Sequence, residues 1–332
     1  MLVITPRLYQ IEAAMTQRHL MLYACGVIEL QRKLLGDGVR NAAFHAALKK
    51  AIVRGKSVVL DIGSGTGFLS FLAERLGAKE CWLVESGEVA ALGETLAAAN
   101  GMERCRFVHA HSGDVPLPKG DVVVSETLGN YALEEGIIGT MNGARSFLKK
   151  GATIIPSSVR QFACPVVSPR VQKGIDVWSV GYGLDFEAAR RISLQNMYVK
   201  TLKTTDLLDA GKAAKAWDEI DFTKENDDIR EATLSWTMKR PATVHGIALW
   251  WESTLVPGVR LSTSPLAKPT HWEQIYLPLL EPVRCARGDV FRLGLASDTS
   301  PDVRVRLRWT AERVRAGRVE NSQRLDTHEG LF

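Results

Sequence analysis

KSVVLDIGSGTGFLSFLAERLG, residues 56–77, is the stretch that decides the fold. The apolar run that leads to Asp61 predicts a short buried strand, and the residues from Phe68 predict an amphipathic helix that ends at Gly77. Between them, the glycines of Gly63–Gly67 allow the backbone to turn sharply and to approach a ligand closely. A strand, a glycine loop and a helix in this order are typical of a nucleotide-binding α/β unit.

The alternation of strand and helix continues beyond this unit. ECWLVES (80–86) predicts a second strand, a helical stretch follows to Asn100, and RFVHA (106–110) and DVVVSE (121–126) predict further strands. Such a βαβ series forms a parallel sheet with helices on both faces. We assign residues 54–156 to a Rossmann-like domain.

Helical periodicity precedes this domain. From about residue 8 to residue 53, apolar residues recur at helical spacing, with one interruption at Gly36-Asp37-Gly38. We expect residues 1–53 to form N-terminal helices that cover the ligand site.

The second half of the chain is predicted to be all-β. After GATIIPSSVR (151–160), short segments of alternating character are separated by Gly and Pro, which is typical of a barrel or sandwich. We assign residues 157–332 to a β-barrel domain. The exception is a polar stretch from about 185 to 228, rich in Lys, Ala and Asp, which predicts a helical arm outside the barrel.

Bulk composition limits the class of protein. The chain has 332 residues, of which 45% are hydrophobic and 24% charged, as in an ordinary globular protein with two domains. It contains no apolar run of about 18 residues, so we expect no membrane span. The N-terminus lacks the apolar stretch of a signal peptide. Its five cysteines are scattered without metal-ligand spacing, so we expect free thiols, a cytoplasmic location and no metal.

The net charge of +5 is mild. Arg304, Arg306 and Arg308 alternate with apolar residues, which fits the solvated face of an edge strand; a patch for an acidic partner or nucleic acid is the alternative. Only Trp309 interleaves with these arginines, whereas single-stranded nucleic acid binding favours several stacking aromatics. We therefore do not expect a nucleic acid partner.

Acidic residues at two strand ends indicate which ligand the glycine loop binds. Asp61, directly before the loop, suits an ammonium group better than a pyrophosphate, although it could also brace the loop. Glu85, at the end of the next strand, could accept from both hydroxyls of a ribose, or stabilise a helix N-terminus. Asp114 follows a later strand, where an adenine amino group could donate to it, but it also fits a turn. This set favours S-adenosylmethionine over a dinucleotide.

Two glutamates in one loop are the expected substrate site. Glu126 follows the strand DVVVS at its carboxyl end, where ligands bind in open α/β sheets. Glu135 can return across the pocket if Gly129-Asn130-Tyr131 forms a hairpin tip. Two carboxylates can hold the planar, delocalised cation of a guanidinium from two sides. The alternative is a solvated acidic loop.

Four stretches resemble the protein arginine methyltransferases, in that family's order. They are DGVRN (37–41), VVLDIGSGTGFLSFLAERLGAKECWLVE (58–85), SETLGNYALEEGI (125–137) and STSPLAKPTHWEQ (262–274). The glycine loop alone is generic to class I methyltransferases, whereas the double-glutamate loop together with Thr270-His271-Trp272 is specific. The resemblance extends from about residue 20 to residue 310.

The resemblance implies a role for each motif residue. The residues implied to hold the cofactor are Arg40, Asp61, Gly63, Ser64, Gly65, Thr66, Gly67, Glu85 and Asp114, with Arg40 at the cofactor carboxylate. Glu126 and Glu135 would hold the guanidinium, and Trp272 would line the arginine channel. His271 would pair with Asp37 and brace the N-terminal helix. The family also implies a β-barrel and a head-to-tail homodimer made by an arm, for which 185–208 is the candidate.

The chain departs from the family pattern around the expected substrate. Of the aromatic pattern of the N-terminal helix only Tyr23 is present, slightly out of register, and it is the candidate there for contact with the substrate. Gln31 and Leu34 replace a histidine and a methionine. In the double-glutamate loop, aromatic residues are replaced by Thr127, Asn130 and Glu134, of which Glu134 is expected to face outward or to form a salt link. These changes bear on the product and on the substrate.

The sequence thus predicts an enzyme that transfers a methyl group from S-adenosylmethionine to an arginine nitrogen and yields S-adenosylhomocysteine. Glu135 or the Asp37–His271 pair would accept the proton. The expected substrate is an arginine-containing protein or peptide, and a small guanidino compound such as free arginine is the alternative. A catalytically silent dimeric scaffold is a further alternative. A nucleic acid methyltransferase is disfavoured because the sequence lacks an Asn-Pro-Pro-Tyr motif.

Overall fold

The computed structural model describes residues 17–178, 182–303 and 305–330, with 17–25 described by their backbone alone. Two helices come first, α2 (Gln17–Gly36) and α3 (Gly38–Ala51), and Asp37 separates them. Asp37 is the N-cap of α3, where its carboxylate accepts from Arg40 N at 2.8 Å. The interruption predicted at Gly36-Asp37-Gly38 is therefore the junction between two helices.

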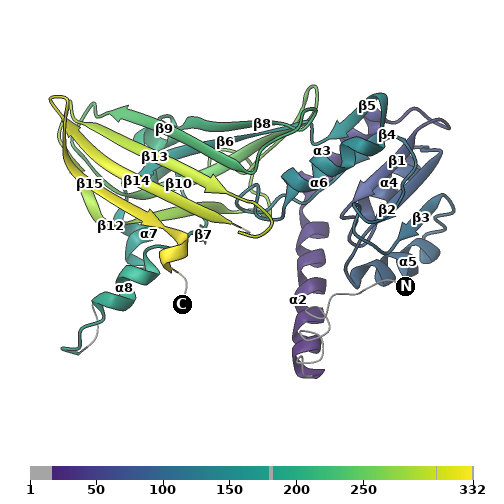
Figure 1. Cartoon of the computed structure of the whole chain (residues 1–332), viewed down its shortest axis with the longest axis horizontal. Coiled ribbons are helices and arrows are strands. Elements are labelled where there is room, and N and C mark those ends of the chain that lie inside the picture. Colours follow the sequence, from purple (N-terminus) through teal and green to yellow (C-terminus); the bar gives the residue numbers. More distant parts are fainter. Residues whose placement is uncertain (1–16, 179–181, 304, 331–332) are drawn as a thin grey trace.

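A parallel five-stranded sheet follows, in the order β3-β2-β1-β4-β5 (Figure 1). Its strands are β1 (Val58–Ile62), β2 (Glu80–Val84), β3 (Cys105–Val108), β4 (Gly120–Val124) and β5 (Leu148–Ile155). The helices that accompany them are α4 (Phe68–Arg75), α5 (Val89–Ala99) and α6 (Ile137–Ala144). This is the predicted Rossmann-like arrangement, with β5 and α6 as elements that the sequence analysis did not identify.

The second half of the chain is built from two antiparallel sheets. The first has the order β7-β12-β10-β6-β8, with β11 beside β10, and the second has the order β15-β14-β13-β9. The first comprises β6 (Ser158–Val166), β7 (Tyr198–Lys200), β8 (Lys215–Asp221), β10 (Ala242–Val256), β11 (Val259–Ser262) and β12 (Gln274–Cys285). The second comprises β9 (Ile229–Thr237), β13 (Val290–Asp298), β14 (Arg306–Arg315) and β15 (Arg318–Asp326).

The two antiparallel sheets enclose one core. Trp309 of β14 is buried and donates from Nε1 to Pro278 O of β12 at 2.8 Å, which joins the sheets across that core. The expected barrel thus consists, among the described residues, of two hydrogen-bonded sheets that face each other. The remaining short 3-10 segments are Arg145–Phe147, Thr204–Asp206, Leu208–Gly211 and Thr327–Gly330.

A helical arm projects from the β domain, but its limits differ from the prediction of 185–228. It contains α7 (Pro169–Lys173) and α8 (Glu187–Ser193), which extend away from the sheets in Figure 1. The stretch from Lys215 is instead strand β8, paired with β6. The Lys- and Ala-rich composition favoured a helix there, and pairing along β6 outweighed that local preference.

One continuous core joins helix α3 to both domains. On α3, Phe44, Ala47 and Leu48 are fully buried, and the helix lies between α4 and strands β10 and β11. The same core includes Leu128 of the double-glutamate loop and Trp251 of β10. Helix α3 is therefore fixed by contacts with both domains.

We predict that Phe44→Ala lowers the free energy of unfolding by about 3–5 kcal/mol, because it removes a fully buried ring from this shared core. Val53→Ala, at an exposed position close to the same helix, should change it by less than about 0.5 kcal/mol. Urea unfolding followed by tryptophan fluorescence measures both. Equal effects of the two variants would contradict the packing of α3.

Candidate active site

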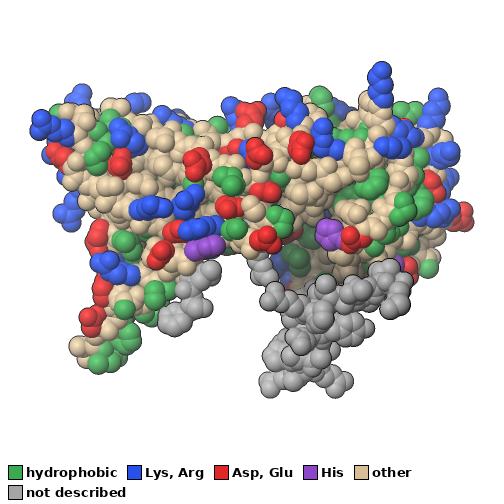
Figure 2. Space-filling view, viewed as in Figure 1, with side chains coloured by type: hydrophobic (Ala, Val, Ile, Leu, Met, Phe, Trp, Pro, Cys, Tyr) green, Lys and Arg blue, Asp and Glu red, His purple; other side chains and the backbone are tan. Residues whose placement is uncertain are grey.

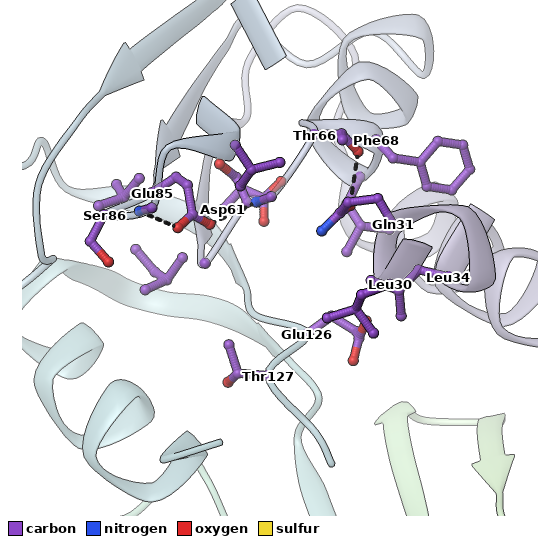
Figure 3. A pocket seen from close by; sticks show the side chains of 18 of the residues that line it. Leu30, Gln31, Leu34, Asp61, Thr66, Phe68, Glu85, Ser86, Glu126 and Thr127 are labelled. Atoms are coloured by element: carbon purple, nitrogen blue, oxygen red, sulfur yellow. Dashed lines mark hydrogen bonds between the residues drawn. The ribbon is translucent and has the colours of Figure 1, made fainter. Parts of the chain in front are cut away.

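A cavity of about 570 Å³ lies at the carboxyl ends of β1, β2 and β4, with α2 along one side (Figure 3). Open α/β sheets bind their ligands at this edge. Figure 3 shows Asp61 and Glu85 on the sheet side and Leu30, Gln31 and Leu34 of α2 opposite them. The cavity is large enough for a nucleoside-sized ligand and a further group beside it.

The glycine loop has backbone angles that explain its composition. Gly63, Gly65 and Gly67 have φ values of 72°, 55° and 84°, in the region that favours glycine. A Cβ at Gly67 would also lie within 2.8 Å of Leu83. The loop is joined to α2 by the Thr66 hydroxyl, which donates to Gln31 Oε1 at 3.2 Å.

Glu85 is held in place by backbone donors and lines the cavity. Its carboxylate accepts from Gly65 N at 2.9 Å and from Gly87 N at 2.7 Å. Two donors fix the carboxyl group while leaving acceptor capacity on its oxygens. Glu85 is therefore placed to accept hydrogen bonds from a pair of ligand hydroxyls, as predicted for a ribose.

Asp61 is a buried carboxylate without a cationic partner among the described residues. It accepts from the Ser70 hydroxyl at 2.8 Å and lines the cavity. Burial raises the pKa of Asp61 to about 7, with Glu85 adding to the rise and Ser70 opposing it. A cationic group of a ligand next to Asp61 would restore its charge, because an opposite charge favours ionisation.

Arg40 forms an ion pair with Glu126 inside the site. Its Nε donates to Glu126 Oε2 at 2.8 Å, its Nη2 contacts the same oxygen, and its Nη1 donates to Asn41 Oδ1 at 2.9 Å. Both side chains are buried and both line the cavity. Burial raises the pKa of Glu126, and Arg40 counters that rise. The sequence analysis predicted a cofactor carboxylate as the partner of Arg40 and did not anticipate this contact with Glu126.

Glu135 reaches the same cavity from the other end of the loop, as the double-glutamate prediction requires. Glu135 keeps an exposed part at the edge of the cavity, and partial burial of its carboxyl, together with the negative charges of Glu126 and Glu134, raises the pKa of Glu135 to about 7. The cavity therefore holds both glutamates of the loop: Glu126 is paired with Arg40, and Glu135 has no cationic partner among the described residues.

The β domain holds this loop through its backbone. Trp272 Nε1 donates to Leu128 O at 2.6 Å and Trp251 Nε1 donates to Gly129 O at 3.0 Å. The two indoles pack edge to face, with centroids 5.0 Å apart. Trp272 is buried and is not among the residues that line this cavity, and its indole N–H is directed at the loop backbone. That it lines an arginine channel stays a prediction.

His271 contacts Asp37, as predicted. Its backbone N and its ring Nδ1 both lie 2.8 Å from Asp37 Oδ2. Burial would raise the pKa of Asp37, but hydrogen bonds from Arg40 N and His271 lower it overall. Burial lowers the pKa of His271 despite the adjacent carboxylate. Neither residue is among those lining the cavity, so the pair joins the β domain to the start of α3 and does not face a ligand directly.

One further predicted residue, Asp114, is not brought to the cavity. Asp114 is exposed and is not among the lining residues, whereas its neighbours His111 and Ser112 are. The turn from His111 to Asp114, closed by Asp114 N donating to His111 O at 2.9 Å, directs the carboxylate elsewhere. Tyr23 lies in α2, but its side chain is outside the described residues.

Some lining residues were not predicted from the sequence. Phe68 of α4, Ser86 after β2 and Thr140 of α6 line the cavity. Thr140 lies in α6, five residues after Glu135. Because the sequence analysis did not predict α6, it had no reason to place Thr140 at the cavity. Among the described residues no group of His, Cys, Asp and Glu is arranged to hold a metal ion, and no helix there is long and apolar enough to cross a membrane.

Comparison with known proteins gives consistent similarities. Residues 161–312 match the model of the arginine methyltransferase oligomerization subdomain, and residues 45–180 match that of ribosomal protein L11 methyltransferase. The chain is 28% identical over 304 residues to the probable protein arginine N-methyltransferase 6.1 of Oryza sativa subsp. indica, covering 79% of each. It is 29% identical over 273 residues to protein arginine N-methyltransferase 6 of Xenopus tropicalis, covering 77% of this chain and 80% of that relative.

A solved structure shows the same fold. The Trypanosoma brucei arginine methyltransferase enzyme–prozyme heterotetramer with AdoHcy aligns with a TM-score of 0.79 at 22% identity. The alignment covers 90% of this chain and 97% of that one. The likeness therefore includes the α/β domain, the β domain and their arrangement.

We predict that Asp61→Asn stabilises the ligand-free protein at pH 8 by about 1–3 kcal/mol and changes little at pH 4. The pKa of Asp61 is raised from 3.8 to about 7 on folding, so the penalty for burying its charge is complete above pH 7 and disappears as the pH falls toward 4. Asparagine keeps an acceptor for Ser70. Thermal unfolding of both proteins at the two pH values measures this, and an equal shift at both would contradict it.

Proposed function

Because this chain belongs to the protein arginine methyltransferase family, we propose that it transfers a methyl group from S-adenosylmethionine to an arginine guanidinium of a protein or peptide. The observation that carries the proposal is the pair Glu126 and Glu135 in one cavity with Asp61 and Glu85. Asp61, Glu126 and Glu135 suit the two cations that the reaction brings together, which are the cofactor and the guanidinium. Glu85 suits the two hydroxyls of a ribose.

The cavity residues divide between cofactor and substrate. Asp61 would take the ammonium group of the cofactor, Glu85 its ribose hydroxyls and Arg40 its carboxylate, since each is of the complementary charge or hydrogen-bonding type. The cofactor supplies a sulfonium methyl group for displacement by a nitrogen nucleophile. S-adenosylhomocysteine would be the product.

Glu126 and Glu135 would hold the guanidinium in position. Arg40 donates to Oε2 of Glu126, so Oε1 remains available for a substrate N–H. Two carboxylates draw positive charge toward the nitrogens that they bind and leave more electron density on the nitrogen to be methylated. Most of the catalysis then consists of positioning and preorganised electrostatics.

Glu135 is the better candidate for proton acceptor. The raised pKa of Glu135, about 7, suits a group that takes up a proton near neutral pH. The alternative pair, Asp37 and His271, is not among the residues lining the cavity and is engaged in joining α3 to the β domain. A proton released in the cavity would therefore reach Glu135 first.

The acceptor is tested by methyl transfer from labelled S-adenosylmethionine to three pools: free arginine with small guanidines, arginine-containing peptides, and whole-cell protein. The proposal predicts label in peptide or protein, recovered as methylarginine after hydrolysis. Label confined to the small molecules would replace the proposed substrate by a free guanidino compound. Cofactor binding without transfer to any pool would indicate a silent scaffold.

We expect Glu126→Gln and Glu135→Gln each to lower kcat/KM for an arginine peptide by about 100- to 1,000-fold, because each removes a charge that holds the guanidinium. Cofactor binding by Glu126→Gln should be unchanged or tighter, since Arg40 loses its partner. Glu225→Gln, an exposed residue outside the cavity, is the matched control. Methylation kinetics and calorimetry with S-adenosylhomocysteine provide the readouts, and retained turnover in either clamp variant would refute the clamp.

Glu85→Ala should weaken S-adenosylhomocysteine binding by about 10- to 100-fold, since charged acceptors to hydroxyls contribute about 1.5–3 kcal/mol. Glu85→Gln should lose less, because it keeps one acceptor oxygen. Calorimetric titration of the three proteins measures the effect. Equal affinity in all three would remove Glu85 from the ribose site.

We further propose that the chain self-associates through its arm and acts in the cytoplasm. Figure 2 shows hydrophobic side chains toward the end of the projecting arm. The exposed apolar residues of this segment are Val177, Tyr182, Leu184 and Phe186. A large exposed apolar patch marks a protein interface. The oligomerization subdomain that the chain matches spans the arm, and free buried cysteines support a reducing compartment.

Leu184→Asp with Phe186→Asp should shift the protein toward monomers, because two charges are placed in the apolar patch at exposed positions. The earlier candidate for the arm, 185–208, includes Leu194, Leu202, Leu207 and Leu208, which are buried in the core, so a deletion there would damage the β domain. Val199→Asp, exposed on β7, is the control. Light scattering after size exclusion gives the mass; an unchanged mass in the double variant would contradict the proposal.

A further inference from the structure

Glu134 lies beside Glu135 but turns away from the cavity. It was expected to face outward or to form a salt link, and the structure places it half-buried inside its own loop. Its Oε1 accepts from Asn130 N at 2.6 Å. A Cβ at Gly129 would collide with the Glu134 side chain, so the loop has glycine where this carboxylate crosses it.

Asn130 extends this contact to the β domain. Its side-chain Oδ1 accepts from Glu273 N at 2.8 Å, directly before strand β12. The backbone of Asn130 is thus bound to Glu134 while its side chain is bound to the β domain. We call these two contacts the Asn130 bracket.

The bracket bears on Glu135 because that residue has no hydrogen-bond donor of its own among the described residues. Glu126, at the other end of the loop, is fixed by Arg40. Glu135 depends on the course of the preceding backbone, to which the Glu134 side chain adds a contact with Asn130 N beside the backbone hydrogen bond from Glu134 N to Tyr131 O. A displacement of about 1 Å at a reacting centre can lower a rate by about 100-fold.

We propose that Glu134 and Asn130 are positioning residues that hold the Glu135 carboxylate at the guanidinium site. The inference rests on the proposed arginine methyltransferase function. Neither residue is among those lining the cavity, so both act through Glu135 and not by touching substrate. The contact between them also gives a structural reason for an asparagine at position 130 and a glutamate at position 134.

The negative charge of Glu134 also affects the pKa of Glu135. The charged groups that face Glu135 are Glu126, which is paired with Arg40, and Glu134. Burial raises the pKa of Glu135 to about 7, and both neighbouring carboxylates contribute. Removing the charge of Glu134 should lower that pKa, so that Glu135 ionises at a lower pH.

Two variants separate geometry from charge. Glu134→Ala removes the acceptor for Asn130 N, whereas Glu134→Gln keeps an acceptor oxygen and removes only the charge. Each is assayed as full-length protein for kcat/KM with an arginine peptide at saturating S-adenosylmethionine, from pH 5.5 to 9. At saturating cofactor Asp61 is already paired, so the acid limb reports Glu135. Asn130→Ala, which keeps the backbone contact but loses Glu273 N, is a third variant, and Glu225→Gln is the control.

The expected result is a loss of about 10- to 100-fold in kcat/KM for Glu134→Ala and a smaller loss for Asn130→Ala. S-adenosylhomocysteine affinity should stay at the wild-type value in both, which also shows that they are folded. Glu134→Gln should recover most of the activity at high pH, with its acid limb moved to lower pH.

Wild-type kcat/KM in Glu134→Ala would overturn the proposal. It would also be overturned if Glu134→Gln were as defective as Glu134→Ala and its pH profile had not moved. A wild-type protein that binds the cofactor but methylates no arginine peptide would instead refute the proposed function on which the inference rests.

Discussion

The buried ion pair between Arg40 and Glu126 is the contact on which the rest of the site depends. Glu126 lies just after β4, at the start of the double-glutamate loop, and Arg40 lies in the first turn of α3. The start of α3 is capped by Asp37, which in turn is bound by His271 of the β domain. Removing one partner of a buried pair leaves an uncompensated charge and costs about 3–5 kcal/mol. The pair therefore joins α3 to the end of β4, and the adjacent Asp37–His271 contact joins α3 to the β domain.

Several hydrogen bonds from the β domain hold the double-glutamate loop, which lies between the two domains. Its backbone carbonyls at Leu128 and Gly129 accept from two indoles, and Tyr131, fully buried, donates its hydroxyl to Ser297 at 2.7 Å. Substrate-side geometry is thus set mainly by the β domain, whereas cofactor-side geometry is set by the glycine loop and the strand ends. In this arrangement Thr127 lines the cavity directly, whereas Asn130 contacts the β domain and does not line the cavity.

Much of the fold and part of the site could be predicted from the sequence. The glycine loop, Asp61 and Glu85 were identified because a strand end, a turn and a helix start are local patterns with a fixed spatial outcome. The direction of a side chain in an irregular loop is not local, so Asp114 was placed in the cavity although its turn directs it to solvent. Spacing also cannot show that the indole N–H of Trp272 is taken by Leu128 O. Strand β8 was missed since its pairing with β6 depends on residues about fifty positions away.

If the cavity presents carboxyl groups whose charge is restored by cationic ligands, ligand binding should release protons. Burial raises the pKa values of Asp61 and Glu135 to about 7. Calorimetry at pH 6.5 in buffers of different ionisation enthalpy would count the protons released, first with S-adenosylhomocysteine and then with an arginine peptide. We expect release in both steps, with the first lost in Asp61→Asn and the second lost in Glu135→Gln. Tight binding of both ligands without proton release would rule out this role of the two carboxyl groups.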